Sequence, residues 1–348
     1  MLNDIVKPLT EWYRQNKRSL PWRDRHNAYY TWVSEIMLQQ TRVEAVKPYF
    51  RRFTEELPDP AALAECPEEK LLKLWEGLGY YNRVRNMQIA AQTVVEEYDG
   101  VLPASYEKLL SLKGIGSYTA GAIASIAYDI PVPAVDGNVL RVITRIIEDD
   151  GDIMKQSVKK RIENKLQEIM PGDYPGDFNQ ALMELGAVVC VPNGEPKCDV
   201  CPVAFCCGAR AHGTIDRFPV KAQKKDRKLE DRTVLVIQDG EKTAIRRRPS
   251  RGLLAGLYEL PNLKGHLSEE EVLESVKAMD LEPLRIEALP EAKHIFSHIE
   301  WRMTAYRVRV SSLEEIRQND LLFVGKRQSD DQYAIPSAFS AYTKYIRE

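Results

Sequence analysis

The chain has 348 residues, which is long for a single hydrophobic core, so we expect two domains. Its hydrophobic fraction of 44% and charged fraction of 29% are typical of a globular protein in water. The sequence has neither the long apolar run of a membrane-spanning helix nor, at its start, the apolar core of a signal peptide. We therefore expect a cytoplasmic protein, and nothing suggests more than a monomer.

The net charge of −2 means that binding to a polyanion would depend on local basic patches. Such patches occur at Arg83 and Arg85, at Arg141 and Arg145, and in the segment 221–228. The alternative for each patch is a solvated surface.

The first part of the chain, residues 1–216, is predicted to be helical because its apolar residues recur at helical spacing. Helical patterns cover 30–42, 68–76, 84–98, 105–111, 117–128, 138–147, 155–169 and 177–189. In the first of these, one apolar stripe is formed by Trp32, Val33, Ile36 and Met37. Glu35 lies off that stripe.

Residues 217–230 form a predicted basic linker, and residues 231–348 a second, α+β domain. Two β-rich runs flank Asp239-Gly240, which is a strong hairpin signal. Further strands are predicted at 256–261, 294–310 and 321–324, and a helix is predicted at 269–279.

The segment 112–127 contains two glycines, Gly114 and Gly116, on either side of Ile115 and just before a predicted helix. Glycine permits a tight turn and close approach of another backbone, and the free N–H groups at a helix start can bind a phosphate. This pattern predicts a helix-hairpin-helix that contacts the DNA backbone; the alternative is an ordinary joint between helices.

Asp136 follows an apolar run and precedes Gly-Asn and another predicted helix. Asp136 or Asn138 could simply cap this helix. The distance of Asp136 from the hairpin weighs against capping as its sole role.

Four of the six cysteines lie between residues 198 and 207, and Cys190 precedes them. Clustered cysteines in a cytosolic chain favour a metal or iron–sulfur site over disulfides. Zinc ribbons usually supply two Cys-x-x-Cys pairs, whereas this region contains one.

Taken together, the hairpin and the following aspartate resemble the helix-hairpin-helix glycosylase superfamily, and this resemblance makes Asp136 the catalytic aspartate. The cysteines resemble the [4Fe–4S] loop of its endonuclease III-like and MutY-like members, although the first spacing is one residue longer here. The implied ligands are Cys190, Cys198, Cys201 and Cys207, with Cys206 as a competitor for the fourth position.

Two features select the branch of the superfamily. Lyase members carry a lysine nucleophile where this chain has Tyr118, which favours a monofunctional glycosylase. The segments 19–23, 33–44 and 77–86 closely resemble MutY-type adenine DNA glycosylases. The resemblance implies an all-α helix-hairpin-helix domain with a [4Fe–4S] loop over 190–207, followed by a Nudix-like domain.

This resemblance also implies a reaction: removal of adenine mispaired with 8-oxoguanine or guanine in double-stranded DNA. Glycoside cleavage needs a proton for the leaving group and negative charge near the sugar. Glu35 would supply the proton and Asp136 the charge, while Asn138 and Tyr118 would orient them.

Further roles follow from the same family match. The adenine pocket would be lined by Trp22, Arg23 and Gln180. The hairpin at Gly114 and Gly116, with Arg83 and Arg85, would contact the DNA backbone. Recognition of 8-oxoguanine would use Leu38, Gln40, Thr41, the wedge residue Tyr80, and the hairpin tip Phe296, Ser297 and His298.

Three alternatives remain open at this point. The nearest is an endonuclease III-like lyase that acts on oxidised pyrimidines. The second is a DNA-binding protein that carries a cluster but has no catalytic activity. The third, a nucleotide pyrophosphatase, is disfavoured because residues 231–340 lack the Arg-Glu pair of active Nudix hydrolases.

Overall fold

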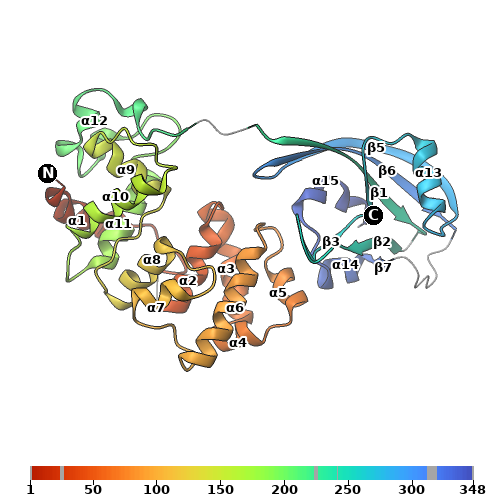
Figure 1. Ribbon diagram of the computed structural model, residues 1–348, viewed down its shortest axis with the longest axis horizontal. Helices are drawn as coiled ribbons and strands as arrows, with labels where there is room; N and C mark the ends of the chain where they lie inside the picture. Colours follow the sequence, from red (N-terminus) through yellow and green to blue (C-terminus); the bar gives the residue numbers. More distant parts are fainter. Residues whose placement is uncertain (1, 24–26, 223–225, 241, 312–319, 347–348) are drawn as a thin grey trace. The chain divides into compact units, whose positions relative to one another are not determined.

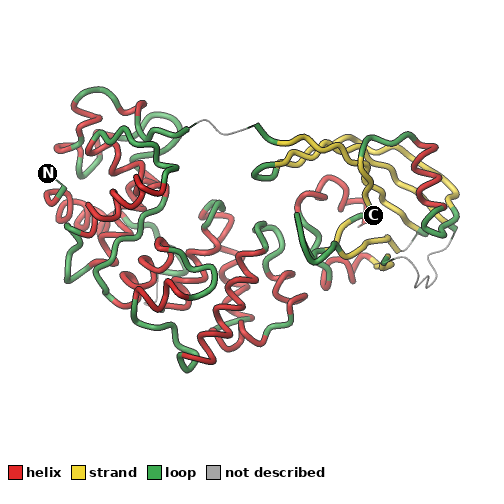
Figure 2. The backbone as a smooth tube through the Cα atoms, viewed as in Figure 1, coloured by secondary structure: helices red, strands yellow, loops and turns green. Residues whose placement is uncertain are grey.

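The computed structural model describes residues 2–23, 27–222, 226–240, 242–311 and 320–346. It separates into two compact units, and each is described by itself. The first contains residues 1–66 and 82–223, and the second contains residues 67–81 and 224–348. Residues 223–225 of the predicted basic linker lie outside the described residues. Figure 2 shows helices throughout the first unit and the strands gathered in the second.

The first unit is helical, as predicted (Figure 1). Its α-helices are α1 (Val6–Asn16), α2 (Ala28–Leu38), α3 (Val43–Glu56), α4 (Pro60–Glu65), α6 (Asn82–Glu97), α7 (Tyr106–Ser111), α8 (Ser117–Tyr128), α9 (Gly137–Ile147), α10 (Gln156–Gln167), α11 (Pro175–Val188) and α12 (Gly208–Ala211). Within the described residues, no helix is long and apolar enough to cross a membrane.

One hydrophobic core of this unit forms where α9 and α11 pack together and against α1. Val139 and Ile143 of α9 are fully buried at a spacing of one helical turn, and so are Phe178 and Leu182 of α11. Both α9 and α11 contribute side chains to the pocket described below, so burial of their apolar faces fixes the side chains that they direct into it.

Two glycines let the backbone close up around this pocket. A Cβ on Gly121 of α8 would collide with the carbonyl oxygen of Pro133. A Cβ on Gly176 of α11 would lie 2.6 Å from the carbonyl oxygen of Ser125. Glycine is therefore required where α8 meets α11 and the segment that leads to Asp136.

The second unit is built on one mixed sheet with α-helices. Its strands are β1 (Lys228–Gln238), β2 (Lys242–Arg247), β3 (Tyr258–Glu259), β4 (Asn262–Lys264), β5 (Pro283–Ile295), β6 (Ile299–Val310) and β7 (Leu321–Gly325). The order is β3-β2-β1-β6-β5, with β4 also paired to β1 and β7 to β2. The central pair β1–β6 is parallel and the other pairs are antiparallel.

Apolar residues are buried on both faces of this sheet. In β1, Val234 and Val236 belong to one hydrophobic cluster, whereas Leu235 and Ile237 belong to another. The second cluster includes residues of α13 (Glu269–Lys277), and the first includes residues of the C-terminal segment that contains α15 (Ser340–Thr343). A further helix, α14 (Lys326–Gln332), follows β7.

The segment 67–81, which contains α5 (Glu68–Leu74), packs in the second unit although it lies between two parts of the first in sequence. The Lys73 ammonium donates to the carbonyl oxygen of Tyr333 at 3.0 Å, and the Glu76 carboxylate accepts from the backbone N–H of Ile335 at 2.7 Å. The packing of this segment in the second unit was not predicted from the sequence.

Several predicted elements have different bounds in the structure, such as the strand predicted over 256–261, which is β3 at Tyr258–Glu259. The helix predicted over 30–42 ends at Leu38, because Gln40 adopts a left-handed backbone with φ of 62°. The strand predicted over 294–310 is the end of β5, a turn at 296–298, and β6. The hairpin at Asp239-Gly240 is confirmed by antiparallel pairing of β1 with β2.

Candidate active site

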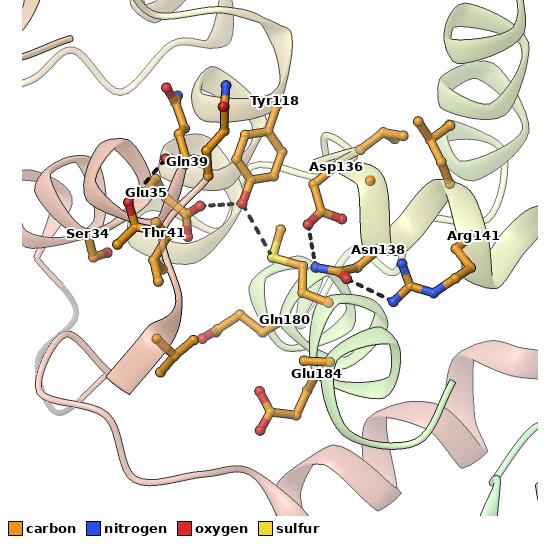
Figure 3. A pocket seen from close by; sticks show the side chains of 18 of the residues that line it. Ser34, Glu35, Gln39, Thr41, Tyr118, Asp136, Asn138, Arg141, Gln180 and Glu184 are labelled. Carbon is orange, nitrogen blue, oxygen red and sulfur yellow. Dashed lines mark hydrogen bonds between the residues drawn. The ribbon is translucent and has the colours of Figure 1, made fainter. Parts of the chain in front are cut away.

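The first unit contains a cavity of about 780 Å³ between helices that lie far apart in sequence. Its walls come from the segment before α2, from α2 itself, from the starts of α8 and α9, and from α11. All four predicted catalytic residues line it, namely Glu35, Tyr118, Asp136 and Asn138. Figure 3 shows the Glu35 and Tyr118 side chains meeting on one side of the pocket, with Asp136 and Asn138 opposite.

Glu35 lies on α2 with its side chain directed into the pocket rather than into solvent. It is 7% exposed and accepts a short hydrogen bond from the Tyr118 hydroxyl of α8. Burial, together with the charge of Asp136, raises the pKa of Glu35 to about 7 from its ordinary value of 4.5. The Tyr118 hydrogen bond and the charge of Arg23 act in the opposite direction. A carboxyl group in this state can hold a proton near neutral pH and release it.

Asp136 is the N-cap of α9, and it also lines the pocket, so the two roles weighed for it are compatible. One carboxylate oxygen accepts from the backbone N–H of Val139 at 2.7 Å, and the other accepts from the Asn138 amide at 2.8 Å. Arg141 in turn donates to the Asn138 side-chain oxygen at 2.9 Å. Burial raises the pKa of Asp136, while these hydrogen bonds lower it.

The remaining pocket residues named from the sequence are also present in its walls. They are Trp22, Arg23, Leu38, Gln40, Thr41 and Gln180. The structure adds Glu184, one helical turn after Gln180 on α11, which sequence reasoning missed. Its signal was a spacing of four residues from Gln180, which places both on one helix face.

The predicted hairpin lies between α7 and α8. Gly114 has φ of 79°, and a Cβ there would lie 2.7 Å from the Asn86 Cβ atom, so the turn requires glycine. Gly116 is the N-cap of α8 and is exposed. Of the two arginines grouped with the hairpin, Arg85 is half-buried, whereas Arg83 donates to the carbonyl oxygens of Ile36 and Gln39 and so helps to end α2.

The four cysteines named as cluster ligands all line a second, smaller cavity in the first unit, namely Cys190, Cys198, Cys201 and Cys207. An Arg145 N–H donates to the Cys190 sulfur at 3.2 Å. Cys206 does not line this cavity, and its thiol donates to the carbonyl of Val203. Among the described side chains, no three or more His, Cys, Asp or Glu are grouped tightly enough to hold a single metal ion.

In the second unit, Phe296, Ser297 and His298 form the tip of the β5–β6 hairpin, as the family match implied. Ser297 and His298 are exposed, while Phe296 packs edge-on against Trp301 with 5.0 Å between ring centres. Tyr80, in segment 67–81 of the same unit, is 49% exposed. Its hydroxyl forms a hydrogen bond with the Ser297 hydroxyl at 3.0 Å. Two residues far apart in sequence therefore form one exposed pair.

Comparison with protein families matches both units. A model of the HhH-GPD superfamily of base excision DNA repair proteins matches residues 33–171, and a NUDIX domain model matches residues 233–345. The adenine DNA glycosylase of Mus musculus is 36% identical, over 86% of this chain and 69% of the mouse protein. That of Buchnera aphidicola from Acyrthosiphon pisum is 31% identical, over 87% of this chain and 86% of its own.

Solved structures resemble more than half of the chain. A thermostable thymine-DNA glycosylase is 25% identical with a TM-score of 0.54, over 60% of this chain and 96% of its own. Endonuclease III in a non-covalent complex with DNA is 23% identical with a TM-score of 0.52, over 61% of this chain and 98% of its own. The similarity to endonuclease III shows a shared fold.

Proposed function

The chain belongs to the adenine DNA glycosylase family, and on that premise we propose that it hydrolyses the N-glycosidic bond of adenine paired with 8-oxoguanine or guanine in duplex DNA. The observation that carries this proposal is the raised pKa of the buried Glu35 carboxyl group in the pocket. A buried carboxyl group with a pKa of about 7, inside a pocket with a second carboxylate, can protonate a leaving base near neutral pH.

In the proposed reaction Glu35 donates its proton to N7 of the flipped adenine while Tyr118 holds the carboxyl group in place. The bond between N9 and C1′ then breaks, and adenine leaves with the proton. Positive charge develops on the sugar, and Asp136 stabilises it. Water adds its hydroxyl group to C1′ and returns a proton to Glu35, which restores the starting state.

Asn138 and Arg141 position Asp136 for this role. The Asn138 amide donates to the Asp136 carboxylate, and its own oxygen is held by the Arg141 guanidinium. Arg141 is 5% exposed and also donates to the carbonyl of Gly186 at 2.6 Å. This chain of hydrogen bonds ties the carboxylate to α11 and limits its motion.

The pocket walls match a purine in chemistry. Trp22 offers a buried aromatic surface, while Gln180 and Arg23 offer an amide and a guanidinium that can bond to base edges. We propose that these three side chains hold adenine, and that Leu38, Gln40 and Thr41 contact the purine opposite.

We propose that residues of the second unit also recognise that purine. In our proposal the exposed Ser297 hydroxyl bonds the oxidised base, His298 senses its exocyclic group, and Phe296 supports the hairpin tip. Tyr80 enters the duplex at the base step. The helix-hairpin-helix at Gly114 and Gly116 contacts DNA phosphates, and so does Arg85. Arg83 bonds to carbonyl oxygens at the end of α2.

The four cysteines of the second cavity fit a [4Fe–4S] cluster. All four line one cavity, and cysteine thiolates are the ligands that such clusters take. A bound cluster would stabilise the loop that it holds. Arg145 would bond to its Cys190 ligand, and Cys206 stays outside the ligand set.

The test is single-turnover cleavage of a duplex that contains adenine opposite 8-oxoguanine, with and without alkali. We expect strand breaks at the adenine after alkali alone, and a loss of about 10²–10⁴-fold in Glu35→Gln with DNA binding retained. The control is Glu55→Gln, an exposed carboxylate of α3. Breaks without alkali and trapping by borohydride would support the lyase instead, and binding without any abasic product would refute both.

A further inference from the structure

Glu184 is a buried carboxylate that the proposed reaction does not use. It lies on α11 with its side chain 1% exposed, and it binds two arginines of the segment between α1 and α2. Arg18 donates to both of its oxygens, at 2.6 and 3.0 Å, and Arg23 donates to one of them at 2.8 Å. Arg23 also donates to the carbonyl of Arg18, so the three side chains form one unit in the pocket wall.

The charge state of Glu184 differs from that of Glu35 in the same pocket. Burial alone would raise the pKa of Glu184, but the hydrogen bonds from Arg18 and Arg23 lower it to about 2. Glu184 therefore remains charged at neutral pH and cannot donate a proton to a leaving base. Its negative charge partly cancels that of Arg23, and the positive charge of Arg23 lowers the pKa of Glu35.

We infer that Glu184 is a positioning residue of this active site: it fixes Arg18 and Arg23 in the pocket wall and offsets their charge, so that Glu35 keeps the proton it delivers. This inference rests on the proposed function, because it assigns Glu184 a role in that same reaction.

The charge balance of the pocket supports this role. The groups that act on Glu35 are Tyr118 of α8, Asp136 before α9 and Arg23 before α2. The other cationic groups in the walls are Arg18, Arg141, Lys159 and Lys221. The wall carboxylates besides Glu35 are Asp136 and Glu184. Removing the charge of Glu184 would leave Arg23 less neutralised beside the acid, and an ionised Glu35 would be favoured.

The test is the pH dependence of single-turnover adenine excision by Glu184→Gln. If protonated Glu35 drives the rate, the midpoint of the profile should fall by about one pH unit, since an uncompensated cation nearby lowers the pKa of a carboxyl group. The rate should be about tenfold lower well above the midpoint and unchanged well below it. Asp177→Asn is the matched control, because it removes the exposed Arg14–Asp177 pair of the same helix. Its midpoint should remain that of the wild type.

A second variant separates charge from structure. Arg23→Gln/Glu184→Gln removes one charge of each sign, so its midpoint should return to the wild-type value even if its maximal rate is lower. It also gives a test if Glu184→Gln alone fails to fold, because Arg23, the more buried of the two arginines, is then removed together with its partner. A loss that is uniform across pH, or a double variant with a lowered midpoint, would overturn the inference. An absence of excision in the wild type would instead refute the proposed function.

Discussion

Glu35→Gln should make the first unit more stable at alkaline pH while it removes the proton donor. Glu35 is buried, and its pKa in the folded chain is about 7, against 4.5 for an ordinary glutamate. The folded state therefore holds this proton over a pH range in which the unfolded state has lost it. Stability falls as the pH rises from 4.5 through 7, because ionising the buried carboxyl costs free energy.

The size of this effect follows from the difference between the two pKa values. Each unit corresponds to about 1.4 kcal/mol, so the cost approaches about 3 kcal/mol at pH values above both. Glutamine cannot ionise, and its side-chain oxygen can still accept from Tyr118. A change of 1 kcal/mol moves the melting temperature of a unit of about 200 residues by roughly 2–4 °C. We therefore expect Glu35→Gln to melt roughly 6–12 °C higher at about pH 8.

The measurement is thermal unfolding of the wild type and Glu35→Gln at about pH 4.5 and about pH 8, followed by circular dichroism at a helical wavelength. The two proteins should have the same melting temperature at the acid pH and different melting temperatures at the alkaline pH. Glu55→Gln, which changes an exposed carboxylate on α3, should have the melting temperature of the wild type at both pH values. Equal melting temperatures of wild type and Glu35→Gln at both pH values would refute the claim that this buried carboxyl titrates near neutral pH.

Three further predictions concern packing, ligation and recognition. Gly121→Ala forces a Cβ against a backbone carbonyl and should destabilise the first unit by about 1–3 kcal/mol in thermal melts, whereas Gly172→Ala, with open space at its Cβ position, should not. Cys207→Ser should lose bound iron and its visible absorbance while Cys206→Ser keeps both; the reverse result would exchange the two assignments. Ser297→Ala should reduce the preference for 8-oxoguanine over guanine about fivefold, the value of one hydrogen bond of about 1 kcal/mol, and equal losses opposite both bases would contradict this role.

Most of the fold could be predicted from local pattern, and the misses have physical causes. The helix 117–128 was predicted with the bounds of α8, because its N-terminal glycines and apolar run are strong local signals. The helix α3 was missed although Val46, Phe50 and Phe53 have helical spacing, since Pro48 interrupts the pattern. The strand β5 was missed because it is an edge strand whose mostly exposed residues do not alternate.

The packing of segment 67–81 in the second unit could not be predicted from local sequence pattern. Its contacts include hydrogen bonds to residues that lie more than 200 positions away, such as Lys73 with Tyr333 and Glu76 with Ile335. Tyr80 and Ser297 are likewise more than 200 positions apart in sequence. The family match named both of these residues, but only the folded unit places their hydroxyls together.

The charges of the active-site carboxylates also could not be predicted from the sequence alone. Glu35 and Glu184 are chemically identical, are both buried, and line one pocket, yet the pKa of the first rises to about 7 and that of the second falls to about 2. The difference comes from their partners: Glu35 accepts from a neutral phenol, and Glu184 accepts from two guanidinium groups. Those arginines lie more than 160 positions from Glu184 in sequence. A motif can therefore indicate which carboxylates reach the pocket, whereas the charge that each one carries is decided by the fold.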